Sequence, residues 1–92
     1  MAYTLSYSGV DQFLYDVFAH AWKISGEERK AEVACGAIKW YIATGRASSD
    51  FLRAMLSSDP RHIAKLSLQG GSDDEILARI KTYLKRRSAR TA

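Results

Sequence analysis

The sequence is poor in the residues that carry covalent or metal chemistry. Cys35 is the one cysteine among 92 residues, so no disulfide can form within the chain. Two histidines, His20 and His62, lie 42 residues apart, and neither belongs to a cluster of about four ligands such as a zinc site needs. These absences argue against a disulfide scaffold and a metal centre. We therefore expect no metal and no cofactor.

Long hydrophobic runs are also lacking. No stretch approaches the roughly 18 apolar residues that a membrane span requires. The opening Met-Ala-Tyr-Thr-Leu has no basic region followed by an apolar core, which a secretory leader would show. We expect a cytoplasmic protein with no membrane partner.

Catalytic motifs are missing as well. The acidic groups Glu27-Glu28 and Asp73-Asp74-Glu75 fall in the first turns of expected helices, where acids favour the helix dipole. The segment Gly70-Gly71-Ser72 lacks the Lys-Ser/Thr and the preceding strand of a phosphate-binding loop. Cys35 stands among small residues, which favours a buried thiol over a nucleophile. The sequence predicts a protein that is not an enzyme.

What the chain does contain is helical periodicity. Apolar residues recur every three or four positions in five segments, separated by short turns, which is the pattern of amphipathic helices. Ninety-two residues have room for one core. We predict one all-α domain over residues 1–92, a compact bundle of about five short helices. The apolar positions expected on the helix faces are Val10, Phe13, Leu14, Val17, Phe18, Ala21, Trp22, Ala31, Ala34, Ile38, Tyr41, Ile42, Phe51, Leu52, Met55, Leu56, Ile63, Ala64, Leu66, Ile76, Leu77, Ile80, Tyr83 and Leu84.

Local signals mark where these helices begin and end. Two segments, 25–28 and 72–75, read as capping boxes, in which a Ser hydroxyl and a Glu carboxylate bond to each other's backbone amides. Gly45 is expected to end the second helix in the left-handed conformation. Ser48 or Ser49 can cap the third helix, and Asp59-Pro60 opens the fourth. Small residues at 31, 34, 36 and 37 predict close approach of a neighbouring helix.

The two ends of the chain are expected to differ from the bundle. Tyr3, Leu5 and Tyr7 alternate with small residues, a period of two that predicts an extended arm over residues 1–8, with Ser8 capping the next helix. Residues 85–92 are expected to form a basic tail that is free to be disordered. Such an arm could pack on the helices or on a second copy of the chain.

Positive charge is concentrated at the C-terminal end. Residues 79–90 contain six bases and no acid, whereas the rest of the chain has eight bases and ten acids. A basic helix with Tyr83 nearby could bind nucleic-acid phosphates, at the cost of strong salt dependence. The candidate phosphate-binding residues are Lys81, Lys85, Arg86, Arg87 and Arg90. The alternative is a solvated, solubilising helix end.

A different binding surface is predicted around Trp40. With Ile38, Tyr41 and Ile42 turned inward, Trp40 should face outward beside Lys39, where an exposed Trp favours a partner or ligand. The candidate residues are Lys39, Trp40, Arg46, Trp22 and Lys23, which offer rings for stacking and charge for an anion. The partner would be a protein or a small anionic ligand such as a nucleotide held between protomers, and we expect a homo-oligomer. The alternative is a Trp40 that packs against the arm or the first helix.

The stretch Ile38–Pro60 resembles one in small accessory proteins of temperate phages and prophages. There a helix ending in Tyr-Ile leads through a Gly turn to Phe-Leu-x-Ala-Val-Leu and then Asn-Asp; here residues 41–45, 51–56 and 58–59 correspond. The chain departs from this pattern at 46–49, where the prolines common in that turn are missing. The resemblance covers about a quarter of the chain.

This resemblance implies provenance and no specific activity. Small phage accessory proteins commonly act by binding a host or defence component. It therefore implies a phage-encoded, counter-defence binder of a host protein or a small nucleotide messenger, working in the host cytoplasm. A nucleic-acid-binding module that uses the basic C-terminal helix is the alternative.

Overall fold

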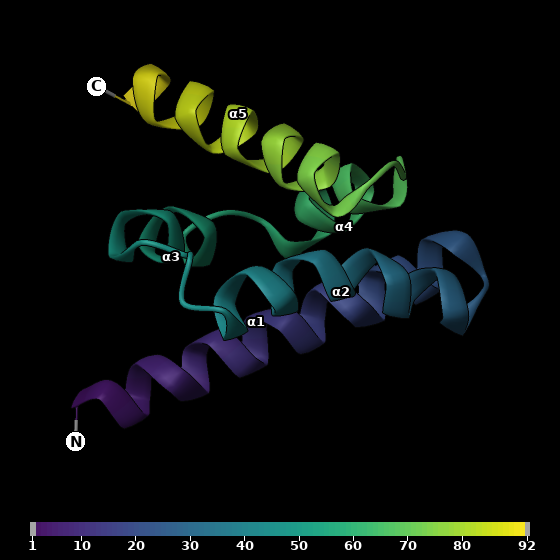
Figure 1. The fold of residues 1–92 in the computed structure, drawn as a ribbon, viewed down its shortest axis with the longest axis horizontal. Coiled ribbons are helices and arrows are strands. Elements are labelled where there is room, and N and C mark those ends of the chain that lie inside the picture. Colours follow the sequence, from purple (N-terminus) through teal and green to yellow (C-terminus); the bar gives the residue numbers. More distant parts are fainter. Residues whose placement is uncertain (1, 92) are drawn as a thin grey trace.

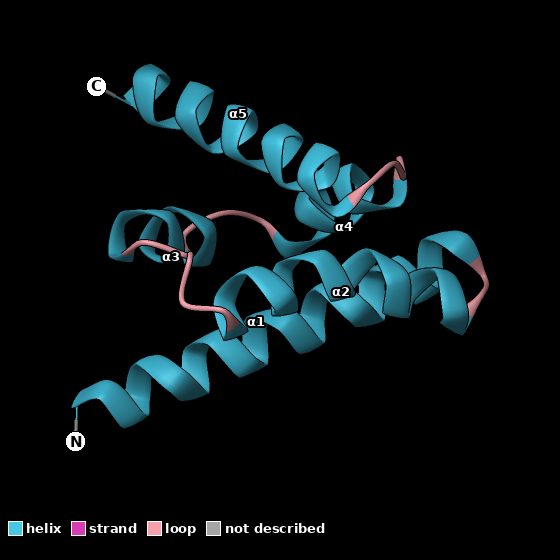
Figure 2. Cartoon of the chain, viewed as in Figure 1, coloured by secondary structure: helices cyan, strands magenta, loops and turns pink. Residues whose placement is uncertain are grey.

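The computed structural model describes the backbone of residues 2–91 and the side chains of residues 9–88. Five helices follow one another over residues 2–91 (Figure 1). They are α1 (Ala2–Ser25), α2 (Glu28–Ala43), α3 (Ser49–Leu56), α4 (Pro60–Leu68) and α5 (Asp73–Thr91). Short loops join them, and residues 2–91 contain no strand (Figure 2). The predicted all-α bundle is confirmed.

The buried face of α1 is the surface on which the bundle assembles. Val10, Phe13, Leu14, Val17 and Ala21 recur at helical spacing and are all buried. The helix makes its most extensive contacts with α4 and α2, while α5 packs on α2, α3 and α4. In Figure 1, α1 and α5 accordingly run along opposite edges of the molecule.

Alanines allow α1, α2 and α4 to approach closely. Ala21, Ala31, Ala37 and Ala64 have no exposed surface, and Ala34 is 2% exposed. Small side chains at a crossing shorten the distance between helix axes. The expectation of close packing at the first half of α2 is met by its alanines, whereas a Cβ placed on Gly36 would have no neighbour within 4 Å. Gly36 therefore has no packing role in this crossing.

Most predicted core positions are buried or partly buried, but two are exposed. Trp22 is 44% exposed and Leu56 36% exposed. Trp22 lies in the last turns of α1, at the margin of its apolar stripe, and Leu56 is the last residue of α3. Positions at the end of a helix have fewer neighbouring elements to cover them, so periodicity alone overestimated their burial.

Three of the predicted helix starts are confirmed by hydrogen bonds. The Ser48 hydroxyl accepts from the amide of Phe51 at 3.1 Å, and the Asp59 carboxylate accepts from the amide of Arg61 at 2.9 Å. The box over 72–75 is reciprocal: the amide of residue 72 donates to Glu75 Oε1 at 2.9 Å, and the amide of residue 75 donates to Ser72 Oγ at 3.2 Å. These caps satisfy amides that the first helical turn leaves without partners.

The other predicted capping box is wrong. Ser25 belongs to α1, and the N-cap of α2 is Glu27, whose side chain makes no capping hydrogen bond. Gly26 has a φ of 75° and donates its amide to Trp22 O at 2.7 Å, so it ends α1 in the left-handed conformation. Ser25 Oγ instead accepts from the amide of Glu27 in the turn. The same four residues thus form the junction between the end of α1 and the start of α2, and the capping-box pattern does not distinguish such a junction from a capped helix start.

Both ends of the chain are helical where they were expected to be irregular. The backbone of α1 begins at Ala2 and continues through Ser8, so the structure has neither an extended arm nor a cap at Ser8. A single strand has no partner for its amides and carbonyls, whereas a helix satisfies them within itself. The backbone of α5 likewise stays helical through Thr91, across most of the expected tail, and Ala92 lies outside the described residues.

Two arginines of α5 fasten it to the preceding elements. Arg79 donates to Leu66 O at 2.8 Å and to Gly70 O at 3.1 Å, so its guanidinium caps carbonyls at the C-terminal end of α4. Arg87 donates to Ser57 O at 2.9 Å, in the turn after α3. These bonds join segments up to 30 residues apart.

Met55 and Leu56 provide a matched test of the core. Met55 has no exposed surface, whereas Leu56 lies at the surface. We expect Met55→Ala to lower the free energy of unfolding by about 2–5 kcal/mol, because it leaves a cavity, and Leu56→Ala by less than about 1 kcal/mol. Urea denaturation followed by circular dichroism measures both. Equal losses would contradict the assignment of Met55 to the core.

Gly45 and Gly36 should respond to alanine with opposite signs. Gly45 has a φ of 75°, which costs a residue with a Cβ about 1 kcal/mol, so Gly45→Ala should destabilise the protein. Gly36 lies inside α2 with open space beside it, so Gly36→Ala should stabilise the protein by about 0.5–1 kcal/mol. Thermal denaturation compares the two variants, and a stabilised Gly45→Ala protein would refute the cap.

Candidate binding surface

Trp40 lies at the surface near the C-terminal end of α2, as predicted. It is 40% exposed, and the guanidinium carbon of Arg46 lies 4.9 Å from the centroid of its ring. The turn at Gly45 makes this contact possible, because Gly45 donates to Ile42 O at 3.1 Å and Arg46 donates to Tyr41 O at 3.2 Å. Those bonds fold the chain back over the last turn of α2. The two candidate residues Trp40 and Arg46 are thus brought together.

The neighbouring ring, Tyr41, carries a second cation. Lys81 Nζ of α5 lies 4.6 Å from the centroid of the Tyr41 ring, and that ring packs edge-on against Phe51 at 5.1 Å. Lys81 was expected to serve a separate nucleic-acid surface. We call Trp40, Tyr41, Arg46 and Lys81 the α2 C-terminal cluster; it presents two aromatic rings, each with a basic group over it.

Two of the other residues predicted for this surface, Trp22 and Lys23, lie elsewhere. Lys39 is exposed and directly precedes Trp40 at the same end of α2, on the side of the helix that also carries Cys35. Trp22 and Lys23 are in the last turn of α1, near the turn of the α1–α2 hairpin, whereas Trp40 lies about 18 Å along α2 from the start of that helix at Glu28. Trp22 packs edge-on against Phe18 at 5.7 Å. The predicted five-residue site is therefore two separate surfaces.

The basic residues of α5 are partly engaged within the fold. Lys81 covers Tyr41 and Arg87 bonds to Ser57 O, whereas Lys85 and Arg86 are exposed. The side chain of Arg90 lies outside the described residues. Tyr83, which could have stacked on a base, is instead stacked on His62 with ring centroids 4.1 Å apart and an angle of 10°. The surface available to phosphates is smaller than the sequence suggests.

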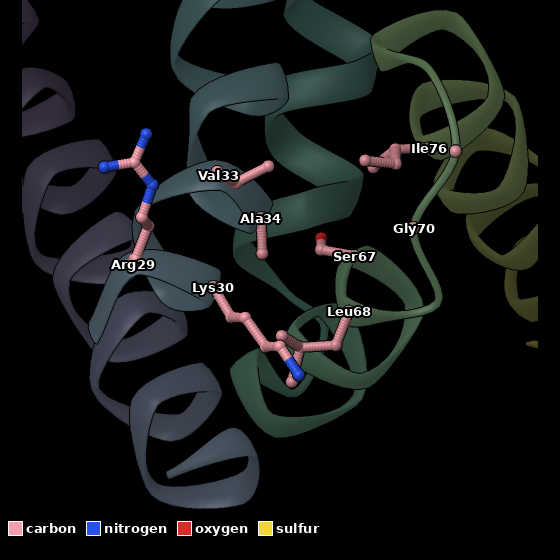
Figure 3. Close-up of a pocket in the computed structure, with 9 residues that line it drawn as sticks. Arg29, Lys30, Val33, Ala34, Ser67, Leu68, Gly70 and Ile76 are labelled. Atoms are coloured by element: carbon pink, nitrogen blue, oxygen red, sulfur yellow. The ribbon is translucent and has the colours of Figure 1, made fainter. Parts of the chain in front are cut away.

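A hollow of about 260 Å³ lies between α2, α4 and the loop before α5 (Figure 3). Its walls include Val33, Ala34, Leu68 and Ile76, and Figure 3 shows the Arg29 side chain extending away from them. Ser67 is buried here and donates its hydroxyl to Ile63 O at 2.9 Å. Ligand sites combine apolar walls with a few polar groups that converge on the ligand. This hollow has apolar walls but few polar groups directed into it, so it is a weaker candidate than the surface around Trp40.

Catalytic and metal chemistry find little support among the described side chains. Cys35 is 2% exposed, its Sγ lies 3.8 Å from Leu14 O, and burial raises the pKa of its thiol to about 11. A thiolate nucleophile needs the opposite shift. Within residues 9–88 no group of three or more His, Cys, Asp or Glu side chains could hold a metal ion. Over the same part of the chain, no helix is long and apolar enough for a membrane span.

Comparison with models of protein families, with curated proteins and with solved structures found no match. The resemblance of residues 38–60 to small phage proteins therefore stays a prediction, and the surface is argued from its geometry.

Three contacts of α5 were not predicted from the sequence. Arg79 caps α4, Arg87 bonds to the turn after α3, and Lys81 covers Tyr41. Their only signal in the sequence is the basic stretch itself, which says nothing of which cations turn toward the bundle. Helical phase gives a hint for Arg87, since it shares the face of Ile80 and Leu84, both buried.

Burial of Cys35 predicts a pH dependence of stability. Because the folded pKa lies above the unfolded value of 9.0, the neutral thiol favours the folded state, and this contribution is lost as pH rises from 9 toward about 11. We expect the free energy of unfolding to fall more steeply over this range in the wild type than in Cys35→Ala. Urea titrations at several pH values measure the difference, and parallel curves would contradict a buried thiol.

Proposed function

We propose that this protein works by binding, without catalysis, and that its recognition surface is the α2 C-terminal cluster. The observation that carries the proposal is the pairing of an exposed Trp40 with Arg46, next to Tyr41 with Lys81. Two rings and two cations at one helix end suit a partner that combines a planar or apolar group with negative charge.

The chemistry of the pair Trp40–Arg46 defines the partner more closely. A guanidinium that stacks on a ring by its face keeps the N–H groups at its edge directed outward, in the geometry that binds carboxylate or phosphate with two hydrogen bonds. The exposed part of the Trp40 ring can cover an adjacent planar group. The partner would thus carry a carboxylate or phosphate beside a planar or apolar group.

Two sources of that chemistry fit the resemblance to small phage accessory proteins. One is an acidic segment of a host or defence protein, and the other is a small nucleotide messenger. Under this proposal the protein is a phage-encoded inhibitor that blocks or sequesters its partner in the host cytoplasm. The mass of the captured molecule distinguishes the two sources.

Nucleic-acid binding through α5 is the second candidate. It is favoured by the exposed pair Lys85 and Arg86 in α5, which belongs to the stretch 79–90 with six bases and no acid. If these two and Arg90 each neutralised one DNA phosphate, the logarithm of the association constant would fall with the logarithm of salt concentration at a slope of about −2.7. A gel shift of the full chain on duplex DNA at several salt concentrations tests this. No shift at low salt would exclude it.

The first proposal predicts that Arg46→Ala loses its partner but keeps its fold. We expect tagged protein recovered from its host to carry added mass in native mass spectrometry, and Arg46→Ala to lower the captured fraction at least about tenfold, since one charged hydrogen-bond donor is worth roughly 1.5–3 kcal/mol. Arg46→Lys should recover only part of the capture, because an ammonium lacks the planar fork.

Arg53→Ala is the matched control, since Arg53 of α3 has an 80% exposed side chain and pairs only loosely with Asp50, at 4.0 Å. It should capture the partner like the wild type. The proposal fails if Arg46→Ala and Arg53→Ala behave alike, or if Trp40→Ala unfolds the domain as a core deletion would.

A further inference from the structure

The face of α1 that points away from the bundle is open and carries two different edges. Along one edge lie Tyr15, which is 65% exposed, and Trp22, which is 44% exposed. Along the other lie Asp16 and Lys23, and Ala19 is exposed between the two edges. In Figure 1, α1 runs along an edge of the molecule, with the other helices to one side of it. Among the helices of residues 2–91, none covers this face.

The spacing of these residues has a twofold pattern. Tyr15 and Trp22 are seven residues apart, and so are Asp16 and Lys23. Seven residues are about two helical turns, so each pair lies along one line of the helix. The midpoint of the first pair falls between residues 18 and 19 and that of the second between 19 and 20. The two midpoints lie half a residue to either side of Ala19, so the four residues taken together are centred on Ala19.

A second, antiparallel copy of α1 matches this pattern. In a twofold interface a residue i contacts j of the partner while j contacts i, and antiparallel helices place like edges against each other. An axis at Ala19 sets each Tyr15 against the other copy's Trp22 and each Asp16 against the other copy's Lys23. The small Ala19 at the axis permits close approach of the two helices.

We propose that the protein forms a symmetric dimer through antiparallel pairing of α1, with Ala19 at the twofold axis. Within one chain Asp16 and Lys23 are too far apart to pair, and Asp16 accepts a hydrogen bond from Gln12 at 3.0 Å. The two charges complement each other only when a second, antiparallel copy is present, so the occupant of this face is a second copy. The dimer goes beyond the proposed binding function and does not depend on it, because the α2 C-terminal cluster is built from α2, the turn after it and α5, and contains no residue of α1.

The size of the face sets the expected affinity. The face runs from Gln12 to Lys23, about 16 Å of helix, which places the interface at the small end of specific protein–protein contacts. Aromatic contacts and two symmetric charge pairs make association measurable at micromolar to millimolar protein. Because the charge pairs lie at the rim, the association constant should fall as salt increases.

Charge exchange tests the pairing directly. Sedimentation equilibrium of the full chain from 10 µM to 1 mM should show wild type moving from 10.3 kDa toward twice that mass. Asp16→Lys and Lys23→Asp should each lower the association constant about tenfold, because two attractions become two repulsions, and the double exchange should restore it to within about threefold. Ala19→Lys should leave only monomer, and circular dichroism checks that every variant stays helical.

The control is the same exchange at Asp50 and Arg53, an exposed pair on α3 whose Asp side chain is 95% exposed. Asp50→Lys and Arg53→Asp change net charge identically and should leave the association constant unchanged. In the Trp40→Phe variant Trp22 is the remaining tryptophan, and its fluorescence emission should shift to shorter wavelength as the protein concentration rises. A wild type that stays monomeric at 1 mM, or single exchanges that behave like the α3 controls, would overturn the proposal.

Discussion

Close packing through alanine is the constraint on which the rest of this structure depends. With so few residues, the chain gains its core by bringing α1, α2 and α4 together over five buried alanines, and larger side chains fill the space around them. Ile38, Met55, Ile63 and Ile80 have no exposed surface, so α2, α3, α4 and α5 each contribute a fully buried side chain. An alanine at a close crossing has no room to grow, because overpacking forces neighbouring side chains and backbone to shift. The small residues thus determine the helix arrangement more strictly than the large ones.

The fold could be predicted largely from the sequence because its signals are local. Periodic apolar residues gave the five helices, and caps at Ser48, Asp59 and Ser72 gave three of their starts. The failures are also local patterns, each compatible with two structures. Ser25-Gly26-Glu27-Glu28 fits a capping box that begins a helix, but it also ends α1 at Gly26, and α2 begins at Glu28 without the side-chain cap. Alternating Tyr3, Leu5 and Tyr7 fit a strand only if a partner strand exists, and residues 2–91 contain none.

The candidate surfaces could be predicted only in part, because they depend on contacts between distant segments. The exposure of Trp40 followed from helical phase, but its contact with Arg46 required the geometry of the Gly45 turn. No sequence pattern indicated that Lys81 would cross to Tyr41 or that Tyr83 would stack on His62. Conversely, Trp22 and Lys23 were grouped with Trp40 on residue type alone, and the hairpin places them at opposite ends. On our proposals, the α2 end takes an anionic partner and α1 takes a second copy.

The central claim is that the C-terminal end of α2 recognises an anion attached to a planar group. The most direct test is an NMR titration of the full chain with adenosine 5′-monophosphate, observing the indole N–H resonances of Trp40 and Trp22 together with the backbone amides. We predict a saturable shift of the Trp40 indole and of the Arg46 amide, with the Trp22 indole unmoved. A saturable shift confined to the end of α5 around Lys85 and Arg86, or no saturable shift anywhere, would contradict the claim.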